Sequence, residues 1–141
     1  MIDFSSASGA RGSLPLLADA ERLGRAIEAG AVALWEWHIP EDMMQVSPRL
    51  AEQLGLVPPL LAFPASRFFA LVHPNDIALL KSAMSEAIET GATFAHEFRV
   101  RREHTGELRF LCHEGRVTER DPGGAARILA GASHDVTERR L

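Results

Sequence analysis

The residues of this sequence with the widest chemical repertoire are its histidines and its one cysteine. They are His38, His73, His96, His104, His113, His134 and Cys112. Ser133, His134 and Asp135 are the residue types of a hydrolytic triad. They are consecutive, however, and consecutive side chains of a strand point to opposite faces of the sheet. The three groups therefore cannot converge on one substrate, and no hydrolase is predicted.

A metal site is the second function that these residue types suggest. His113 and Glu114 begin the pattern of a zinc protease, in which a second histidine follows one helical turn later. The position that would hold it is Val117, and the stretch has the alternation of a strand. No Cys and His spacing typical of a zinc site occurs elsewhere in the sequence. We therefore predict neither a metal site nor a catalytic residue, and we expect no enzyme activity from this chain.

Three consecutive strands carry most of these residues. Apolar residues recur at alternate positions, as in strands with one buried face, and Gly106 and Gly123 mark the turns between them. The strands are predicted over 94–102, 107–118 and 126–136. They form an antiparallel meander around which the rest of the chain is organised.

The middle and last of these strands have distinctive faces. Phe110 and Cys112 share one face of the middle strand, whereas Leu111 and Val117 share the other. Both faces are therefore expected to be partly covered, as in the centre of a sheet. In the last strand, the small residues 130–133 would let a helix or a small ligand approach the sheet closely, and we favour a helix.

The first thirty residues are predicted to contain one helix. Residues 1–14 are rich in serine and glycine and are expected to form a flexible arm. Apolar residues at helical spacing indicate an amphipathic helix over 15–30 that ends at Gly30. Its apolar stripe must be covered by the sheet of its own domain or by the same helix of a second copy, and we favour the dimer.

The middle of the chain is predicted to alternate short strands and helices. A strand is expected over 31–39, with Trp35 and Trp37 on its buried face, and a second strand over 43–46. Three prolines between residues 58 and 64 are expected to prevent long regular structure there. Helices are predicted from Ser47 to Gly55, around Phe68 to Val72, and from Asn75 or Asp76 to Gly91.

Composition limits the function classes. The 141 residues suffice for one domain with its own core. A formal net charge of -4 gives no electrostatic reason to expect binding to nucleic acid or to an anionic membrane. One cysteine cannot form an internal disulfide, which favours a reducing compartment. No apolar run reaches the roughly 18 residues of a membrane span, and no signal-peptide pattern is present. We predict a cytoplasmic protein without membrane insertion.

Short motifs spread along the chain give a resemblance to a known family. They are the Trp-containing strand 32–39, the S-x-x-L-x-x-x-x-G-like helix 47–55, the H-P-D-D-like stretch 73–76, the E-F-R-V stretch 97–100, the turn and strand 106–109, and Gly131 with the D-I-T-E-R-like stretch 135–139. At these spacings the sequence resembles a PAS domain with its C-terminal PAC motif, over residues 32–139. Asn75, His104, Thr105 and Phe110 depart from the usual residues without removing a backbone requirement.

The resemblance implies a fold and a function. The fold is α+β, with a five-stranded antiparallel sheet in the order 2-1-5-4-3, helices over one face and the N-terminal amphipathic helix before it. A PAS/PAC sensor domain is expected over 31–137, and the start of a signalling helix over 138–141. Family members are sensory modules, usually homodimers, that regulate an attached output domain. We expect a sensor histidine kinase; the alternatives are a diguanylate cyclase or phosphodiesterase, or a stand-alone haem-binding or flavin-binding protein. Asp135 and Thr137 match the residues that pass strain to the signalling helix.

The resemblance also implies where a ligand would lie. The family's cavity is between the inner sheet face and the long helix, near Trp35, Trp37, Ile77, Met84, Phe98, Phe110 and Cys112. These are equally good core residues, and close packing favours a filled core over a small-molecule pocket. A covalent flavin adduct is not expected, because Cys112 lies on a strand outside the family's N-C-R-F-L helix motif. Residues 77–90 contain no histidine to hold haem. His73 and His96 remain as candidate ligands, but a lone histidine is more often a surface or capping residue, so no cofactor is predicted.

Overall fold

The computed structural model of the protein describes residue 25, residues 32–57 and residues 60–140. The predicted arm over 1–14 lies outside the described residues, as does the predicted helix over 15–30 apart from residue 25. The elements are β1 (Leu34–His38), β2 (Met43–Val46), α2 (Pro48–Gln53), β3 (Ala62–Pro64), α3 (Ala65–Leu71), α4 (Pro74–Thr90), β4 (Phe94–Arg101), β5 (Leu108–Arg120), β6 (Ala126–Asp135) and α5 (Thr137–Arg140).

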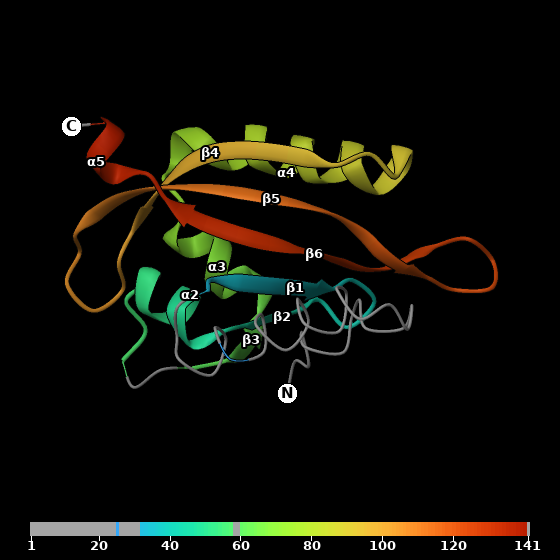
Figure 1. Ribbon diagram of the computed structural model, residues 1–141, viewed down its shortest axis with the longest axis horizontal. Helices are drawn as coiled ribbons and strands as arrows, with labels where there is room; N and C mark the ends of the chain where they lie inside the picture. Colours follow the sequence, from blue (N-terminus) through green and yellow to red (C-terminus); the bar gives the residue numbers. More distant parts are fainter. Residues whose placement is uncertain (1–24, 26–31, 58–59, 141) are drawn as a thin grey trace.

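The strands form one antiparallel sheet of six strands in the order β3-β2-β1-β6-β5-β4 (Figure 1). The α+β fold class is confirmed, and β5, the middle strand of the meander, lies between β4 and β6. The predicted sheet of five strands in the order 2-1-5-4-3 is wrong. The difference is β3, which adds an edge strand beside β2.

Strand β3 is not predicted from the sequence because it contains Pro64. Pro64 pairs with Met43, and Phe63 pairs with Met44, so that the three-residue strand extends the sheet at its edge. A proline is compatible with an edge strand because its missing N–H can fall on the unpaired side. The side chain of Phe63 is buried in the core. The prolines of this region therefore shorten regular structure without preventing it.

Helix α4 is the long helix that the spacing of apolar residues predicts. Gly91 ends it with a left-handed backbone at φ 74°, as expected for the residue after a helix. At the other end, the cap is His73 instead of the predicted Asn75 or Asp76. The His73 Nδ1 accepts a hydrogen bond from the backbone N–H of Asn75 at 3.1 Å. Leu80 and Met84 are buried, and they are the centre of the apolar stripe.

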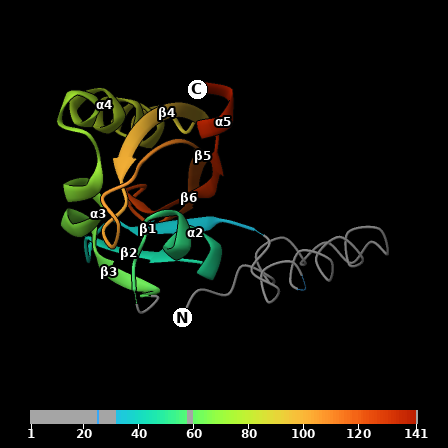
Figure 2. The same ribbon diagram turned by 90° about the vertical axis from the view of Figure 1, so that its left-hand side faces the viewer.

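Helices α3 and α4 lie on the same side of the strongly curved sheet (Figure 2). The core fills the space between them and the inner sheet face. Its largest fully buried side chains include Trp35, Phe63, Phe68 and Phe98. Trp35 donates a hydrogen bond from its indole Nε1 to the Ala132 carbonyl oxygen at 3.1 Å, so that its polar atom is satisfied in the core.

The face of β5 that packs in the core is not the face that carries its apolar residues Phe110 and Cys112. Leu111, His113 and Gly115 are buried on the inner face, whereas Phe110 and Cys112 are half-buried on the opposite face. His113 is 2 % exposed although it is polar. The inner face of β5 therefore consists of the residues at alternate positions from Leu111, and one of these residues is His113.

An ion pair joins the start of α4 to the edge strand β4. The Asp76 carboxylate accepts hydrogen bonds from Arg99 Nε at 2.9 Å and from its terminal nitrogen at 2.8 Å, and it also accepts the Arg99 backbone N–H. These hydrogen bonds lower the pKa of Asp76 from 3.8 to about 2, against the opposing effect of its partial burial. The pair thus fixes α4 over β4 while the carboxylate is ionised.

Replacement of Asp76 by Asn is expected to cost about 1 kcal/mol of unfolding free energy at pH 7, with partial solvent screening of the pair taken into account. Because the pKa of Asp76 is lowered in the folded state, its contribution is complete above about pH 4. It is lost as the pH falls from 3.8 towards 2. Urea titrations at several pH values measure both effects. The matched control is Glu86→Gln on the exposed face of α4, which should leave stability unchanged; an equal effect of both variants would contradict the assignment.

Candidate functional site

The junction between the last strand and the last helix is one candidate site. Asp135 ends β6, and Thr137 begins α5. The Asp135 Oδ1 accepts hydrogen bonds from the backbone N–H of Thr137 at 3.0 Å and from its hydroxyl at 2.6 Å. A carboxylate that binds the backbone N–H two residues later is a typical way to turn the chain and start a helix.

Arg109 completes this junction from the neighbouring strand. Its guanidinium donates to Asp135 Oδ2 from Nε at 2.9 Å and from a terminal nitrogen at 2.8 Å. Burial raises the pKa of Asp135, but the hydrogen bonds from Thr137 and Arg109 outweigh it and bring the pKa below its ordinary value. Arg109, Asp135 and Thr137, here called the junction cluster, therefore form a charged network that stays ionised at neutral pH.

The junction cluster is also bonded to the backbone of β5. The backbone N–H of Phe110 donates to the Thr137 hydroxyl oxygen at 3.0 Å, and the backbone N–H of Val136 donates to the Phe110 carbonyl at 2.8 Å. At the far end of α5, Arg140 Nε donates to the Glu97 carboxylate of β4 at 2.8 Å. Both ends of α5 are thus attached to the sheet, on different strands.

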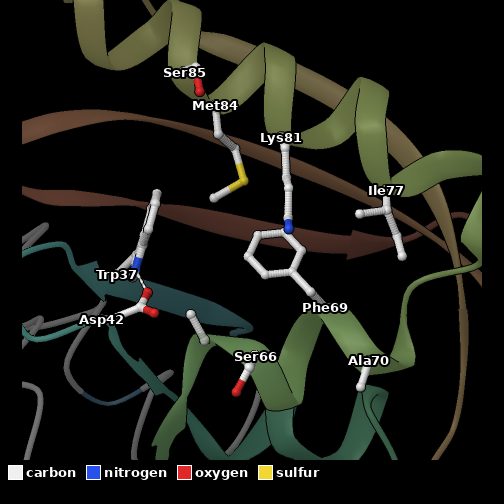
Figure 3. Close-up of a pocket in the computed structure, with 10 residues that line it drawn as sticks. Trp37, Asp42, Ser66, Phe69, Ala70, Ile77, Lys81, Met84 and Ser85 are labelled. Atoms are coloured by element: carbon white, nitrogen blue, oxygen red, sulfur yellow. Dashed lines mark hydrogen bonds between the residues drawn. The ribbon is translucent and has the colours of Figure 1, made fainter.

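A cavity of about 590 Å³ is the second candidate site. It lies between α3, α4 and the hairpin of β1 and β2, and it is within the size range of small-molecule sites. Figure 3 shows side chains from these elements around it. Its wall includes Trp37, Asp42, Phe69, Ile77, Lys81 and Met84.

The cavity wall is fixed by two contacts. The indole Nε1 of Trp37 donates a hydrogen bond to the Asp42 carboxylate at 3.0 Å, which orients the ring across the hairpin (Figure 3). Asp42 itself has a left-handed backbone, with φ 54°, a conformation that Asp tolerates better than most residues. On the helical side, the Lys81 ammonium lies 4.8 Å from the centroid of the Phe69 ring, within the range of a cation–π contact.

The seven ligand-pocket residues proposed from the sequence fall into three groups. Trp37, Ile77 and Met84 line the cavity. Trp35 and Phe98 are fully buried in the core behind it. Phe110 and Cys112 lie on the opposite face of the sheet, so the cavity does not include them. Burial and the nearby carboxylates of Glu114 and Glu97 raise the pKa of the Cys112 thiol, which disfavours a reactive thiolate.

Two polar side chains at or behind this cavity are not among the ligand-pocket residues that the sequence predicts. One is Lys81, which is the sole lysine of the chain and lies on the long helix. The other is His113, whose ring stacks between those of Trp35 and Phe68, with centroid distances of 5.3 Å and 5.4 Å. The signal for His113 was its parity with the apolar Leu111 and Val117, and the signal for Lys81 was its place beside the apolar stripe of α4.

The His113 imidazole is held in an aromatic environment. Phe98 adds an edge-on contact at 4.6 Å between centroids. The Nε2 atom has no hydrogen-bond partner among the described residues. Burial and, to a smaller extent, the charge of His134 lower the pKa of His113 from 6.5 to about 3. The ring is therefore neutral at physiological pH and acts as a flat core side chain.

Within the described part of the chain, no group of three or more His, Cys, Asp or Glu side chains is placed to hold a metal ion. No helix there is long and apolar enough to cross a membrane. The two candidate sites are thus a charged junction at the end of the sheet and a largely apolar cavity with one cation at its wall.

Comparison with known families decides what this fold is. A family model described as the PAS fold matches residues 43–132. The chain belongs to the PAS fold family. The PAS resemblance drawn from the spaced motifs is thereby confirmed, and Asp135 and Thr137 of the junction cluster follow the matched residues.

Two curated relatives of this PAS domain are signalling proteins. The two-component sensor PprA of Pseudomonas aeruginosa is 27% identical over 107 residues, which are 75% of this chain and 11% of that protein. The probable diguanylate cyclase DgcE of Escherichia coli is 26% identical over 119 residues, 84% of this chain and 10% of that protein. The chain therefore spans about a tenth of the length of these relatives.

Solved PAS structures agree with the fold. A sensory box histidine kinase/response regulator from Burkholderia thailandensis has a TM-score of 0.70 and 25% identity, with 84% of this chain and 87% of that chain covered. The N-terminal domain of a diguanylate cyclase with PAS/PAC sensor from Marinobacter aquaeolei has a TM-score of 0.67 and 16% identity, with 78% and 99% covered. The second likeness concerns the fold alone.

Proposed function

We propose that this PAS domain is a cytoplasmic sensory module that regulates an output domain through α5, and that the output domain is a histidine kinase. The junction cluster is the observation that carries the proposal. It bonds the sheet to the first residue of α5, so that a change in the sheet reaches the segment that leaves the domain. The relationship to a two-component sensor supports the kinase.

A diguanylate cyclase is the alternative output, supported by the relationship to DgcE. The proposed domain limits are 31–137 for the PAS domain and 138–141 for the start of the signalling helix. We also propose a homodimer, formed through the amphipathic helix predicted over 15–30. Assay of the polypeptide that carries this chain distinguishes the outputs, because a kinase phosphorylates a histidine whereas a cyclase forms a cyclic dinucleotide.

Removal of the Thr137 hydroxyl is expected to weaken the coupling between the domain and its output. In that polypeptide, Thr137→Ala should reduce the ratio of stimulated to unstimulated output about fivefold or more, because the bonds to Phe110 and Asp135 are lost. Thr137→Ser keeps the hydroxyl and should keep the native ratio. Asp135→Ala should resemble Thr137→Ala.

Glu138→Gln is the control for charge changes on α5, since Glu138 is exposed and lies beside the cluster. Circular dichroism of each variant establishes that the domain is folded. If the folded Thr137→Ala and Asp135→Ala variants both responded to the stimulus like the native protein, the role of the junction cluster would be rejected.

A further inference from the structure

We propose that the cavity between α3, α4 and the β1–β2 hairpin binds a flat aromatic molecule with a single carboxylate. The aromatic ring packs on Trp37 beside Met84, and the carboxylate pairs with Lys81, whose ammonium lies over Phe69. This inference deepens the proposed sensory function, on which it rests for its role as a signal. It names the chemical class of the ligand, which is set by the side chains around the cavity.

The charge of the ligand follows from Lys81. It is the sole lysine of the sequence, and it lies at the cavity wall on α4. Its ammonium contacts the face of Phe69, and no described carboxylate forms an ion pair with it. A cation held over an aromatic ring at the edge of an apolar cavity favours an anion, because a carboxylate can pair with the ammonium while the rest of the ligand covers the apolar wall.

The shape of the ligand follows from the aromatic walls. Trp37 and Phe69 lie on opposite sides of the cavity in Figure 3, with the thioether of Met84 beside the indole. Trp37 makes no ring contact with another described aromatic side chain, in contrast to Trp35, so its face is available. Aromatic faces and a polarisable sulfur favour a flat, unsaturated guest.

Asp42 limits the ligand to one negative charge. Its carboxylate is part of the same wall, and it is held there by the Trp37 indole N–H. A second anionic group on the ligand would approach this carboxylate and be repelled. The wall thus carries one positive and one negative group, on α4 and on the hairpin respectively. A monocarboxylate oriented towards α4 satisfies both.

The size of the cavity agrees with this class. A volume of about 590 Å³ accommodates a molecule of one or two fused rings. Asp42, Ser66, Ala70, Lys81 and Ser85 at its wall are exposed residues, so the cavity opens to solvent. A ligand can therefore enter without unfolding of α3 or α4.

Calorimetric titration of the full 141-residue chain with defined probes tests the proposal. The probes are 2-naphthoate, the neutral 2-naphthalenemethanol, and the dianion 2,6-naphthalenedicarboxylate. We expect 2-naphthoate to bind about tenfold more tightly than either of the others. Lys81→Met should weaken 2-naphthoate about tenfold and leave the neutral alcohol unchanged, whereas Lys81→Arg, which keeps the charge, should retain the binding.

The unique lysine provides an independent readout. Reductive methylation with carbon-13 formaldehyde labels Lys81 without removing its charge, and the dimethyl-lysine signal should shift when 2-naphthoate is added. Equal binding of the acid and the alcohol, unchanged binding by Lys81→Met, or no binding of 2-naphthoate would each overturn the proposal. Binding is measured on this chain alone, so it is independent of the output assay. If 2-naphthoate fails to bind while Thr137→Ala still uncouples the output, the proposed sensory function stands without this ligand class.

Discussion

Below about pH 6.5, His113 alone is expected to reduce the unfolding free energy of this PAS domain by about 1.4 kcal/mol for each pH unit. Burial lowers the pKa of the imidazole from 6.5 to about 3 in the folded protein. Between these values the unfolded chain binds a proton that the folded chain does not, so acid favours unfolding. Above about pH 6.5 this group does not lower the unfolding free energy. Between pH 6.5 and pH 3.5 it lowers the unfolding free energy by about 4 kcal/mol.

Urea titrations between pH 7.5 and 5 measure this slope before most carboxylates titrate. His113→Phe and His113→Leu remove the titrating group, and both should lack the slope whatever their stability at pH 7.5. Two variants are needed because the larger Phe ring can strain the stack with Trp35 and Phe68, whereas Leu fills it less completely. His104→Gln, at an exposed turn, is the control and should keep the slope. An identical slope in the native protein and both His113 variants would show that another group is responsible.

Gly131→Ala is expected to cost about 3 kcal/mol or more of unfolding free energy. Gly131 lies opposite Gly115 in the register of β5 and β6. A Cβ at position 131 would overlap the carbonyl oxygen of Glu114 and would lie 2.6 Å from the Cα of Gly115. These contacts are with backbone atoms in the centre of the sheet, which cannot move without breaking the pairing of two strands.

Gly115→Ala should also be strongly destabilising, because its Cβ would lie 2.8 Å from the Trp35 ring and 2.7 Å from the Ala130 carbonyl oxygen. Gly123→Ala is the matched control in the turn between the same two strands. Its Cβ would meet nothing closer than 3.4 Å, so its effect should remain within about 0.5 kcal/mol. Denaturant titration compares the three variants. A loss below that of the control for Gly131→Ala would mean that the two strands can separate locally without cost.

The long strands and α4 could be predicted because each buries one face over many residues, and burial imposes a period on the sequence. Strand β3 has three residues and ends on Pro64, so it is too short to show a period. The small residues of β6 predict space for a helix against the sheet. The structure instead places the Trp35 ring against Gly115, opposite Gly131, so the space is used by a neighbouring strand of the same sheet.

The candidate site was predictable in part for a similar reason. Trp37, Ile77 and Met84 line the cavity, and each is an apolar residue on an element with a regular pattern. His113 and Lys81 are polar, and hydrophobic periodicity assigns polar residues to the surface by default. The family resemblance predicts that Phe110 and Cys112 lie at the cavity on the inner face, but β5 turns His113 and Gly115 inward instead. Both faces of β5 carry apolar residues. Which of the two faces packs against the helices depends on contacts with other elements, and these contacts cannot be derived from the sequence of β5 alone.

Helix α5 has its first residue bonded to β5 and β6 and its last residue bonded to β4. Helix α5 therefore connects three strands of the sheet. The two attachments differ in kind, because Thr137 is held by hydrogen bonds to Phe110 and Asp135, whereas Arg140 is held by an exposed ion pair with Glu97. Exposed ion pairs contribute little to stability. The last turn of α5 is therefore held less firmly than its first residue.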